Sequence, residues 1–201
     1  TNKPVVGFTS ISVTIPNGLA STDRWPTGVP NGADVSNYQI WSFPGNPTST
    51  SPVNLIVDDM PDAAFDNTKW RAFVYAGSGA WTEFEQLSSL NSGESYFILI
   101  KDPGFSINTG QTYTITTNQP YQINLTSGDW TFIGNPFDFS IPLSSVLTDD
   151  STSLSGDQNF YTYDGGSWTN ASSLEPWGGY IYKSSSASSI SIDPGSSCNV
   201  I

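Results

Sequence analysis

Trp130-Thr131-Phe132-Ile133-Gly134-Asn135-Pro136 carries the pattern from which the fold is predicted. It occurs a second time 89 residues earlier, as Trp41-Ser42-Phe43-Pro44-Gly45-Asn46-Pro47, with five of seven positions identical. Asn and Gly accept left-handed backbone geometry, and Pro fixes φ at the exit of a turn. We therefore interpret the stretch as a strand with a buried Trp that ends in a stiff turn. Its recurrence predicts two copies of one unit.

Further landmarks recur in the same order. Each half contains an Asp-Asp pair with a later Asp, a Tyr that precedes a turn and a Trp, and an apolar strand with a Tyr shortly after a Gly. The period of roughly 85 residues is too long for a solenoid repeat and suits a small β domain. The predicted organisation is an N-terminal strand and Pro/Gly-rich loop (1–35), repeat one (36–111) and repeat two (112–201).

Short runs of β-branched and aromatic residues, separated by Gly and Pro turns, fill both repeats. This pattern predicts an all-β protein with two tandem homologous β-sandwich or barrel-like domains and an extra N-terminal strand. The run 96–100 is apolar throughout, so we expect it in the centre of a sheet. Helix is expected in short turns only, around 62–67 and 143–147.

Composition excludes several classes of function. The 201 residues carry 18 acids against 6 bases, a net charge of −12 that repels nucleic acid and anionic lipid. The chain has no histidine, which removes Ser-His-Asp catalysis and His-ligated metals. The single cysteine, Cys198, allows no internal disulfide; it is interpreted as a small half-buried apolar residue, or alternatively as an intermolecular bridge. With no long apolar run, no membrane span is expected.

Repeat two resembles a module found in tandem in secreted and surface proteins of environmental bacteria. The likeness rests on Trp-x-x-Ile-Gly-Asn-Pro at 130–136, Tyr-x-Tyr-Asp-Gly-Gly-x-Trp at 161–168 and Leu-x-Pro-x-x-Gly-Tyr at 174–180. It covers most of residues 38–201, although repeat one departs from it at Pro44, where the module has an apolar residue. The resemblance implies an all-β fold and a secreted, extracellular or cell-surface location, and it supplies no catalytic residues.

Acidic side chains in the loops are candidates for a Ca²⁺ site, because oxygen ligands from one loop suit that ion. The duplicated candidates are Asp58, Asp59, Asp66, Asp149, Asp150 and Asp157. The plainer interpretation is that they are solvated turn residues. A glycosidase would also need two carboxylates at a set separation, but the sequence favours a protein that is not an enzyme. No other cofactor is expected.

Aromatic side chains next to turns are candidates for stacking on sugar rings. These are Trp25, Trp81, Trp168 and Trp177. The alternative is that each closes the end of a sheet core. Asn124 and Asn170 begin Asn-x-Ser/Thr sequons and are potential glycosylation sites.

The N-terminal strand is long and has no counterpart in repeat two. Its apolar positions are Val5, Val6, Phe8, Ile11, Val13 and Ile15. It can pair within its own chain or add to the sheet edge of a second copy, which would give a head-to-tail polymer. The first hypothesis is therefore a secreted, non-enzymatic structural subunit of a filament or layer whose partner is itself. The alternative is a carbohydrate-binding or adhesion module that uses exposed aromatic residues, with or without Ca²⁺.

Overall fold

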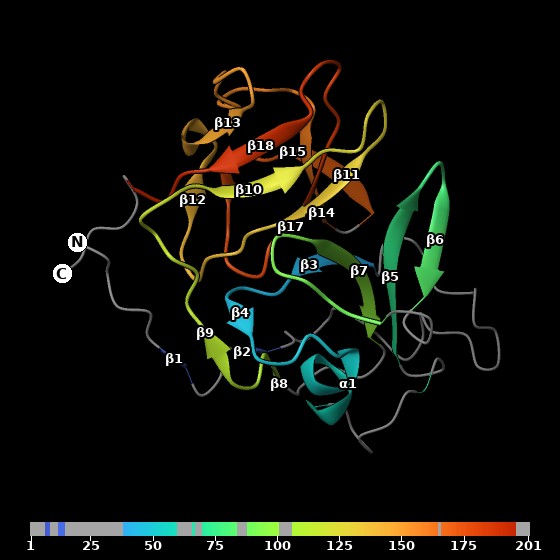
Figure 1. The fold of residues 1–201 in the computed structure, drawn as a ribbon. Coiled ribbons are helices and arrows are strands. Elements are labelled where there is room, and N and C mark those ends of the chain that lie inside the picture. Colours follow the sequence, from blue (N-terminus) through green and yellow to red (C-terminus); the bar gives the residue numbers. More distant parts are fainter. Residues whose placement is uncertain are drawn as a thin grey trace.

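The computed structural model describes residues 7–8, 12–14, 38–59, 66, 70–83, 88–100, 106–164 and 166–195. Strands dominate this part of the chain, and they pair as antiparallel sheets (Figure 1). The all-β prediction is confirmed, and the described strands close no barrel. No helix of the described chain is long and apolar enough to span a membrane.

Two four-stranded sheets form the centre of the molecule, and they have the same strand order. The first has the order β3-β7-β5-β6, with β3 (Gln39–Ser42), β7 (Ser95–Ile100), β5 (Trp70–Gly77) and β6 (Ala80–Glu83). The second has the order β11-β17-β14-β15, with β11 (Thr131–Gly134), β17 (Gly179–Tyr182), β14 (Phe160–Asp164) and β15 (Ser167–Asn170). The apolar run 96–100 lies in β7, in the interior of its sheet as predicted.

The strand register corrects the alignment of the two Trp-containing stretches. Trp41 pairs with Tyr96, whereas the residue that pairs with Tyr180 at the corresponding place in the second sheet is Ile133. The structurally equivalent residue of Trp41 is thus Ile133 and not Trp130. The two copies of the motif are displaced by three residues in space, although five of their seven letters agree.

The two Gly-Asn-Pro segments consequently differ in role. Asn46 is exposed and begins β4 (Asn46–Pro47), which pairs with β9 (Thr112–Tyr113). Asn135 is fully buried, and its side chain donates to the carbonyls of Phe139 and Leu174 at 2.9 and 2.8 Å. Asn135 is thus the buried Asn of the pair, whereas the left-handed geometry expected of the motif occurs at Gly45, whose φ is 81°.

A second layer covers one face of each sheet. In repeat two this layer consists of β10 (Tyr121–Asn124), β18 (Ser189–Ile192) and β13 (Val146–Thr148), with the pair β12 (Ile141–Pro142) and β16 (Ser173–Leu174) beside it. Ile190 and Ile192 of β18 share a buried cluster with Phe160 and Tyr182 of the four-stranded sheet, so repeat two is a β-sandwich.

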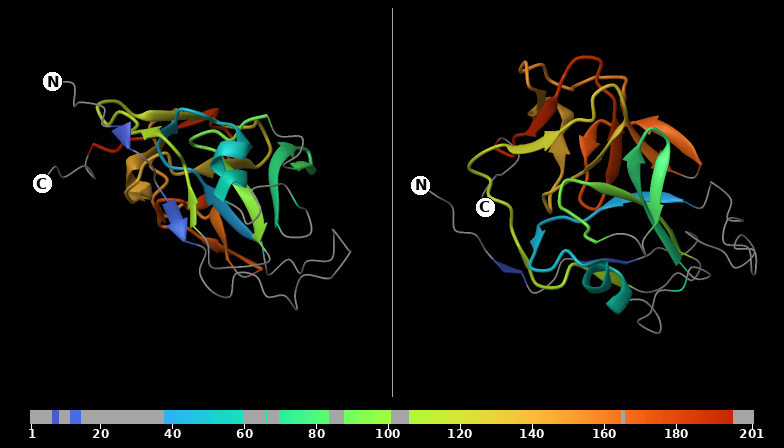
Figure 2. Two further views of the ribbon diagram at one scale, coloured as in Figure 1. Left: turned by 90° about the horizontal axis from the view of Figure 1, so that it is seen from below. Right: turned by 45° about the vertical axis from the view of Figure 1, so that its right-hand side comes forward.

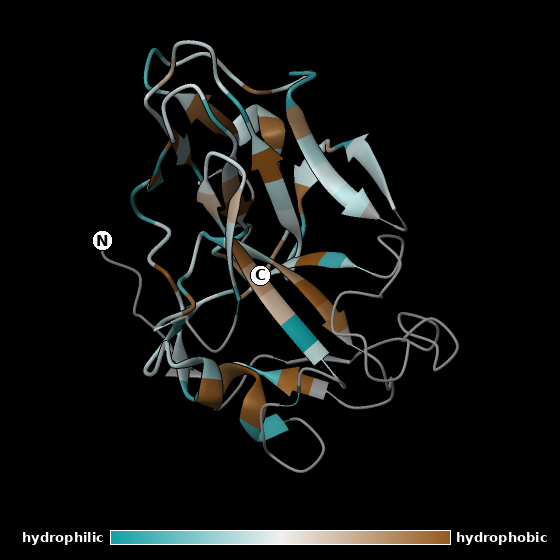
Figure 3. Cartoon of the chain, turned by 90° about the vertical axis from the view of Figure 1, so that its right-hand side faces the viewer, coloured by the Kyte–Doolittle hydropathy of each residue, from teal (hydrophilic) through white to brown (hydrophobic). Residues whose placement is uncertain are grey.

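Repeat one closes its core differently. Its second layer contains α1 (Pro52–Leu55), the 3-10 helix η3 (Val57–Asp59) and β8 (Ser106–Asn108), which pack through the apolar residues Leu55, Val57 and Ile107. Helix α1 was not predicted, although Ser51 caps it and Pro52 occupies its first turn, which are standard start signals. Figure 3 shows the apolar residues of α1 and the strands in brown, with turns mostly teal or white.

Of the two expected helical turns, the first (62–67) lies outside the described residues except for Asp66. The second is present as the 3-10 helix η6 (Leu143–Ser145), after which the chain continues as strand β13.

The described parts of the N-terminal segment pair within the chain. Strand β1 (Gly7–Phe8) is antiparallel to β9, and β2 (Ser12–Thr14) is antiparallel to β8. The assembly-strand candidates Val5, Val6, Ile11 and Ile15 lie outside the described residues. Phe8 and Val13 therefore lie on backbone paired in cis, one of the two arrangements that the sequence left open.

The two sheets meet through close backbone contacts that follow an approximate twofold relation. The Ser42 amide donates to the Trp177 carbonyl at 3.0 Å, and the equivalent Gly134 amide donates to the Gly93 carbonyl at 2.8 Å. A Cβ atom on Gly134 would lie 2.4 Å from the carbonyl oxygen of Glu94. Because the sheets approach so closely, the β5–β6 hairpin of repeat one lies next to strands of repeat two, as the green and orange strands in the right-hand view of Figure 2 show.

Candidate functional site

An aromatic cleft lies where the two four-stranded sheets meet. Its volume is about 470 Å³, and both repeats contribute to its lining. The lining residues are Tyr75, Trp81, Phe97, Trp130, Phe132, Tyr161, Trp168 and Ile181. A concave site with mostly aromatic walls is the usual form of a small-molecule pocket.

Alternation along the strands explains why these rings lie on one side. In β5, Trp70 and Ala72 face the core of repeat one, so Phe73 and Tyr75 face the opposite side. The adjacent β7 behaves in the same way, because Tyr96 and Ile98 are in the core and Phe97 points away. Each four-stranded sheet thus has a second aromatic face, and these faces meet at the cleft.

The rings contact one another mainly edge to face. Phe97 of repeat one lies 5.3 Å from Tyr163 and 5.9 Å from Trp168 between ring centroids. Phe132 of repeat two lies 5.5 Å from Trp81 at an interplanar angle of 88°. Such contacts hold aromatic rings in fixed orientations.

Trp81 and Trp168 are the exposed members of the cluster. Each follows a hairpin turn and packs against the Tyr of the preceding strand, at 5.1 Å from Tyr75 and 4.9 Å from Tyr163. The two residues remain 46% and 42% exposed, respectively. Both hairpins therefore offer a large apolar ring to solvent at corresponding places in the two repeats.

Asp129 fixes the hairpin of repeat one to repeat two. Its carboxylate accepts the hydroxyl proton of Tyr75 at 3.0 Å and the backbone amide of Ser78 at 2.7 Å. The amide of Trp130 donates to the same carboxylate at 2.8 Å. The amides of Ser78 and Trp130 lower the pKa of Asp129, with smaller contributions from Tyr75 and the Lys183 charge.

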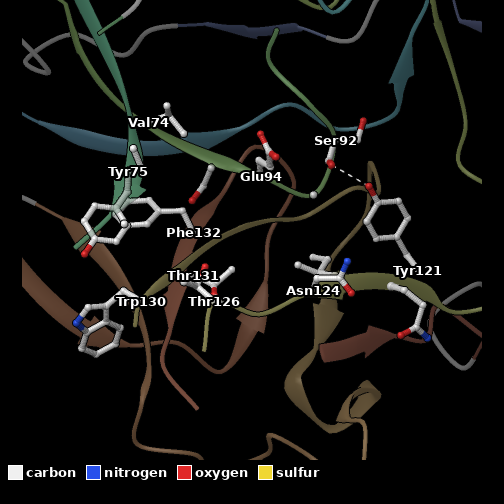
Figure 4. Close-up of a pocket in the computed structure, with 16 residues that line it drawn as sticks. Val74, Tyr75, Ser92, Glu94, Tyr121, Asn124, Thr126, Trp130, Thr131 and Phe132 are labelled. Atoms are coloured by element: carbon white, nitrogen blue, oxygen red, sulfur yellow. Dashed lines mark hydrogen bonds between the residues drawn. The ribbon is translucent and has the colours of Figure 1, made fainter. Parts of the chain in front are cut away.

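A polar pocket of about 440 Å³ adjoins the aromatic cleft, and the two share Tyr75, Trp130 and Phe132 as lining residues. Figure 4 shows these aromatic residues at one end, with Asn124, Tyr121 and Ser92 toward the other. The remaining polar lining side chains are Glu94, Ser95, Gln122, Thr126 and Thr131. The Tyr121 hydroxyl donates to the Ser92 carbonyl at 2.8 Å, and burial followed by the charge of Glu94 raises the Tyr121 pKa.

Two of the four Trp residues expected to stack on sugars lie in the cleft. These are Trp81 and Trp168. Trp177 does not belong to it: its ring packs edge-on against Phe43 at 5.5 Å and joins the core of repeat one. Trp25 lies outside the described residues.

The acidic candidates for Ca²⁺ are not brought together. Among the described residues, no three acidic side chains are grouped as a metal site would require. Asp59 accepts from the backbone and side-chain nitrogens of Asn108 at 2.6 Å each, and its pKa is raised by burial. Asp58 is exposed, and the Asp66 carbonyl accepts from the Trp70 amide at 3.0 Å.

In repeat two the acidic candidates also bind protein donors. Asp149 accepts from Ser188 and Asp150 from Thr148, and these bonds lower the pKa of both carboxyls. Asp157 accepts from the Asn159 amide at 2.7 Å. Their geometry matches loop and turn stabilisation, the alternative that the sequence left open.

The candidate glycosylation sites and the single cysteine lie away from the aromatic cleft or outside the described residues. Asn124 and Asn170 are both exposed, and the Asn170 side chain donates to the Gln158 carbonyl at 3.0 Å. Cys198 lies outside the described residues.

Comparison of the chain with models of protein families, with curated proteins and with solved structures gave no match. The resemblance to the secreted bacterial module therefore stays a prediction, as do the location and the domain boundaries.

Several cleft residues were missed from the sequence. They are Tyr75, Phe97, Trp130, Phe132 and Tyr161. A signal for them existed, because β5, β7, β11 and β14 carry apolar or aromatic residues at consecutive positions rather than in alternation. Such strands are buried or covered on both faces, which indicates a second packing surface for each sheet.

Proposed function

We propose that the protein is a non-enzymatic carbohydrate-binding module and that its ligand stacks in the aromatic cleft. The observation that carries the proposal is the cleft itself, in which two half-exposed Trp rings from corresponding hairpins stand over further aromatic side chains. Contiguous exposed apolar surface with a polar rim marks binding sites in proteins. The negative face of an indole ring attracts the C–H groups on the flat face of a sugar.

The shape of the site favours a sugar over a purely apolar ligand. Polar side chains line the adjoining pocket and can hydrogen-bond hydroxyl groups, since Asn offers both donors and acceptors and Glu offers acceptors. The net charge of −12 disfavours nucleobases that are attached to phosphate backbones, although these also stack on aromatic rings. The ligand that satisfies these conditions is a glycan without phosphate.

The hypothesis of a self-assembling structural subunit stays a prediction. In its form with strand donation, the N-terminal strand would pair with a second copy, whereas the described residues 7–8 and 12–14 pair within their own chain. A lectin-like module displayed on a surface would be compatible with the expected extracellular location.

A glycan array followed by calorimetric titration of the bound sugar tests the proposal. Trp81→Ala and Trp168→Ala should each weaken binding at least about tenfold, which corresponds to about 1.4 kcal/mol. Tyr113→Ala is the matched control, because Tyr113 is a 41% exposed aromatic residue on β9 that does not line the cleft. Binding by both Trp variants at wild-type affinity would refute the proposal, as would an array without any bound glycan.

A further inference from the structure

The aromatic cleft and the polar pocket are adjacent compartments of unlike chemistry. The cleft is lined by aromatic rings and Ile181, whereas the pocket is lined mainly by polar side chains and backbone. They are joined at Tyr75, Trp130 and Phe132, which line both. Each volume falls within the range of about 300–1,000 Å³ that is usual for ligand sites.

We infer that the site binds a neutral oligosaccharide, with one sugar unit stacked in the aromatic cleft and the next in the polar pocket. This inference rests on the proposed function and adds the length and charge of the ligand. A single ring that fills the cleft leaves the pocket to water, whereas a chain of sugars places hydroxyl groups opposite Asn124 and Glu94.

The charges around the site select against acidic sugars. The Glu94 side chain is exposed in the polar pocket, and the Asp129 carboxylate lies beside the shared residues Tyr75 and Trp130. Lys183 is a nearby cation, with its Nζ 5.9 Å from the ring centroid of Trp130. Among the described residues, these two carboxylates outnumber the one ammonium group and leave the surroundings negative, so a uronate or sulfate group would be repelled.

Asn124 is the residue best placed to contact the second sugar. It is exposed on β10 and lines the pocket, and its side chain has no hydrogen-bond partner among the described residues. Its amide can thus donate to one hydroxyl and accept from a neighbouring one without breaking an existing bond.

Calorimetric titration of the wild type with glucose, cellotetraose, maltotetraose and tetragalacturonate tests the inference. We expect at least one neutral tetrasaccharide to bind tenfold more tightly than glucose and at least tenfold more tightly than tetragalacturonate. Asn124→Ala should weaken tetrasaccharide binding three- to tenfold and leave glucose binding unchanged. Asn159→Ala, an exposed turn residue that lines neither compartment, is the control.

Glu94→Gln separates the contribution of charge, because glutamine retains the acceptor oxygen that the Tyr96 hydroxyl uses. This substitution should reduce the difference in affinity between the neutral and the acidic tetrasaccharide. Trp81-dependent binding without any dependence on chain length or on Asn124 would overturn this inference and leave the proposed function standing. Binding of no neutral sugar, or binding that ignores Trp81 and Trp168, would count against the proposed function itself.

Discussion

Asp129 shows how a single side chain can connect the two repeats at the candidate site. It lies just before β11, yet its carboxylate binds the hydroxyl of Tyr75 and the amide of Ser78 in the hairpin of repeat one. The Tyr75 hydroxyl in turn accepts from the Gly79 amide at 2.9 Å. The orientation of Tyr75, and with it the adjacent Trp81, therefore depends on an ionised carboxylate in the other repeat.

This dependence predicts a response to pH. Because the folded-state pKa of Asp129 is lowered, its stabilising contribution is fully present above the ordinary aspartate value of about 3.9 and is lost as pH falls through the lower folded value. An NMR titration should show the Ser78 amide shifting with a midpoint below that ordinary value. Asp129→Asn should remove the transition, and Asp138→Asn, at an exposed aspartate elsewhere, should retain it. A Ser78 midpoint at or above about 3.9 would contradict the assignment.

Among the elements, the strands themselves could be predicted better than the correspondence between strand positions in the two repeats. The all-β class and the interior place of β7 followed from apolar patterning and turn residues, since these depend on local chemistry. The sequence alignment of the two motifs was wrong because identical residues can lie in different structural environments. Asn46 is exposed on a short strand, whereas Asn135 is buried and holds two carbonyls.

The close contact between the two sheets predicts a large loss of stability when Gly134 is substituted. A Cβ atom there would approach the Glu94 oxygen and the Ser42 Cβ to 2.4 Å, so Gly134→Ala should destabilise the fold by about 3 kcal/mol through forced separation of the repeats. Gly156→Ala is the control, because its Cβ meets open space and only the positive φ of 78° opposes it, at a cost of about 1 kcal/mol. Urea unfolding midpoints measure the loss of stability in each of the two variants. An equal loss of stability in the two variants would show that the close approach of the sheets at Gly134 does not limit the side chain at this position.

For the whole molecule, the candidate site exists because two similar sheets dock through their second faces. Trp81 and Trp168 were recognisable as candidates from the sequence, since a Trp after a hairpin turn is a local feature. The contact between Phe97 and Trp168 was not predictable, because it depends on how the repeats dock. Trp177 follows the other interpretation that the sequence left open, since at φ 63° it occupies the position of Gly93 in repeat one and its partly buried ring packs against the core of that repeat.

A glycan that binds as proposed, in the aromatic cleft formed by both repeats, would contact several tryptophans at once. The most direct test is to follow the indole N–H resonances of the seven tryptophans by NMR while a bound neutral oligosaccharide is titrated. We predict that the resonances of Trp81, Trp168 and Trp130 shift together and saturate with one affinity, while those of the buried Trp41 and Trp70 stay in place. Shifts confined to tryptophans outside the cleft, with the Trp81 and Trp168 resonances unchanged, would contradict glycan binding in the cleft.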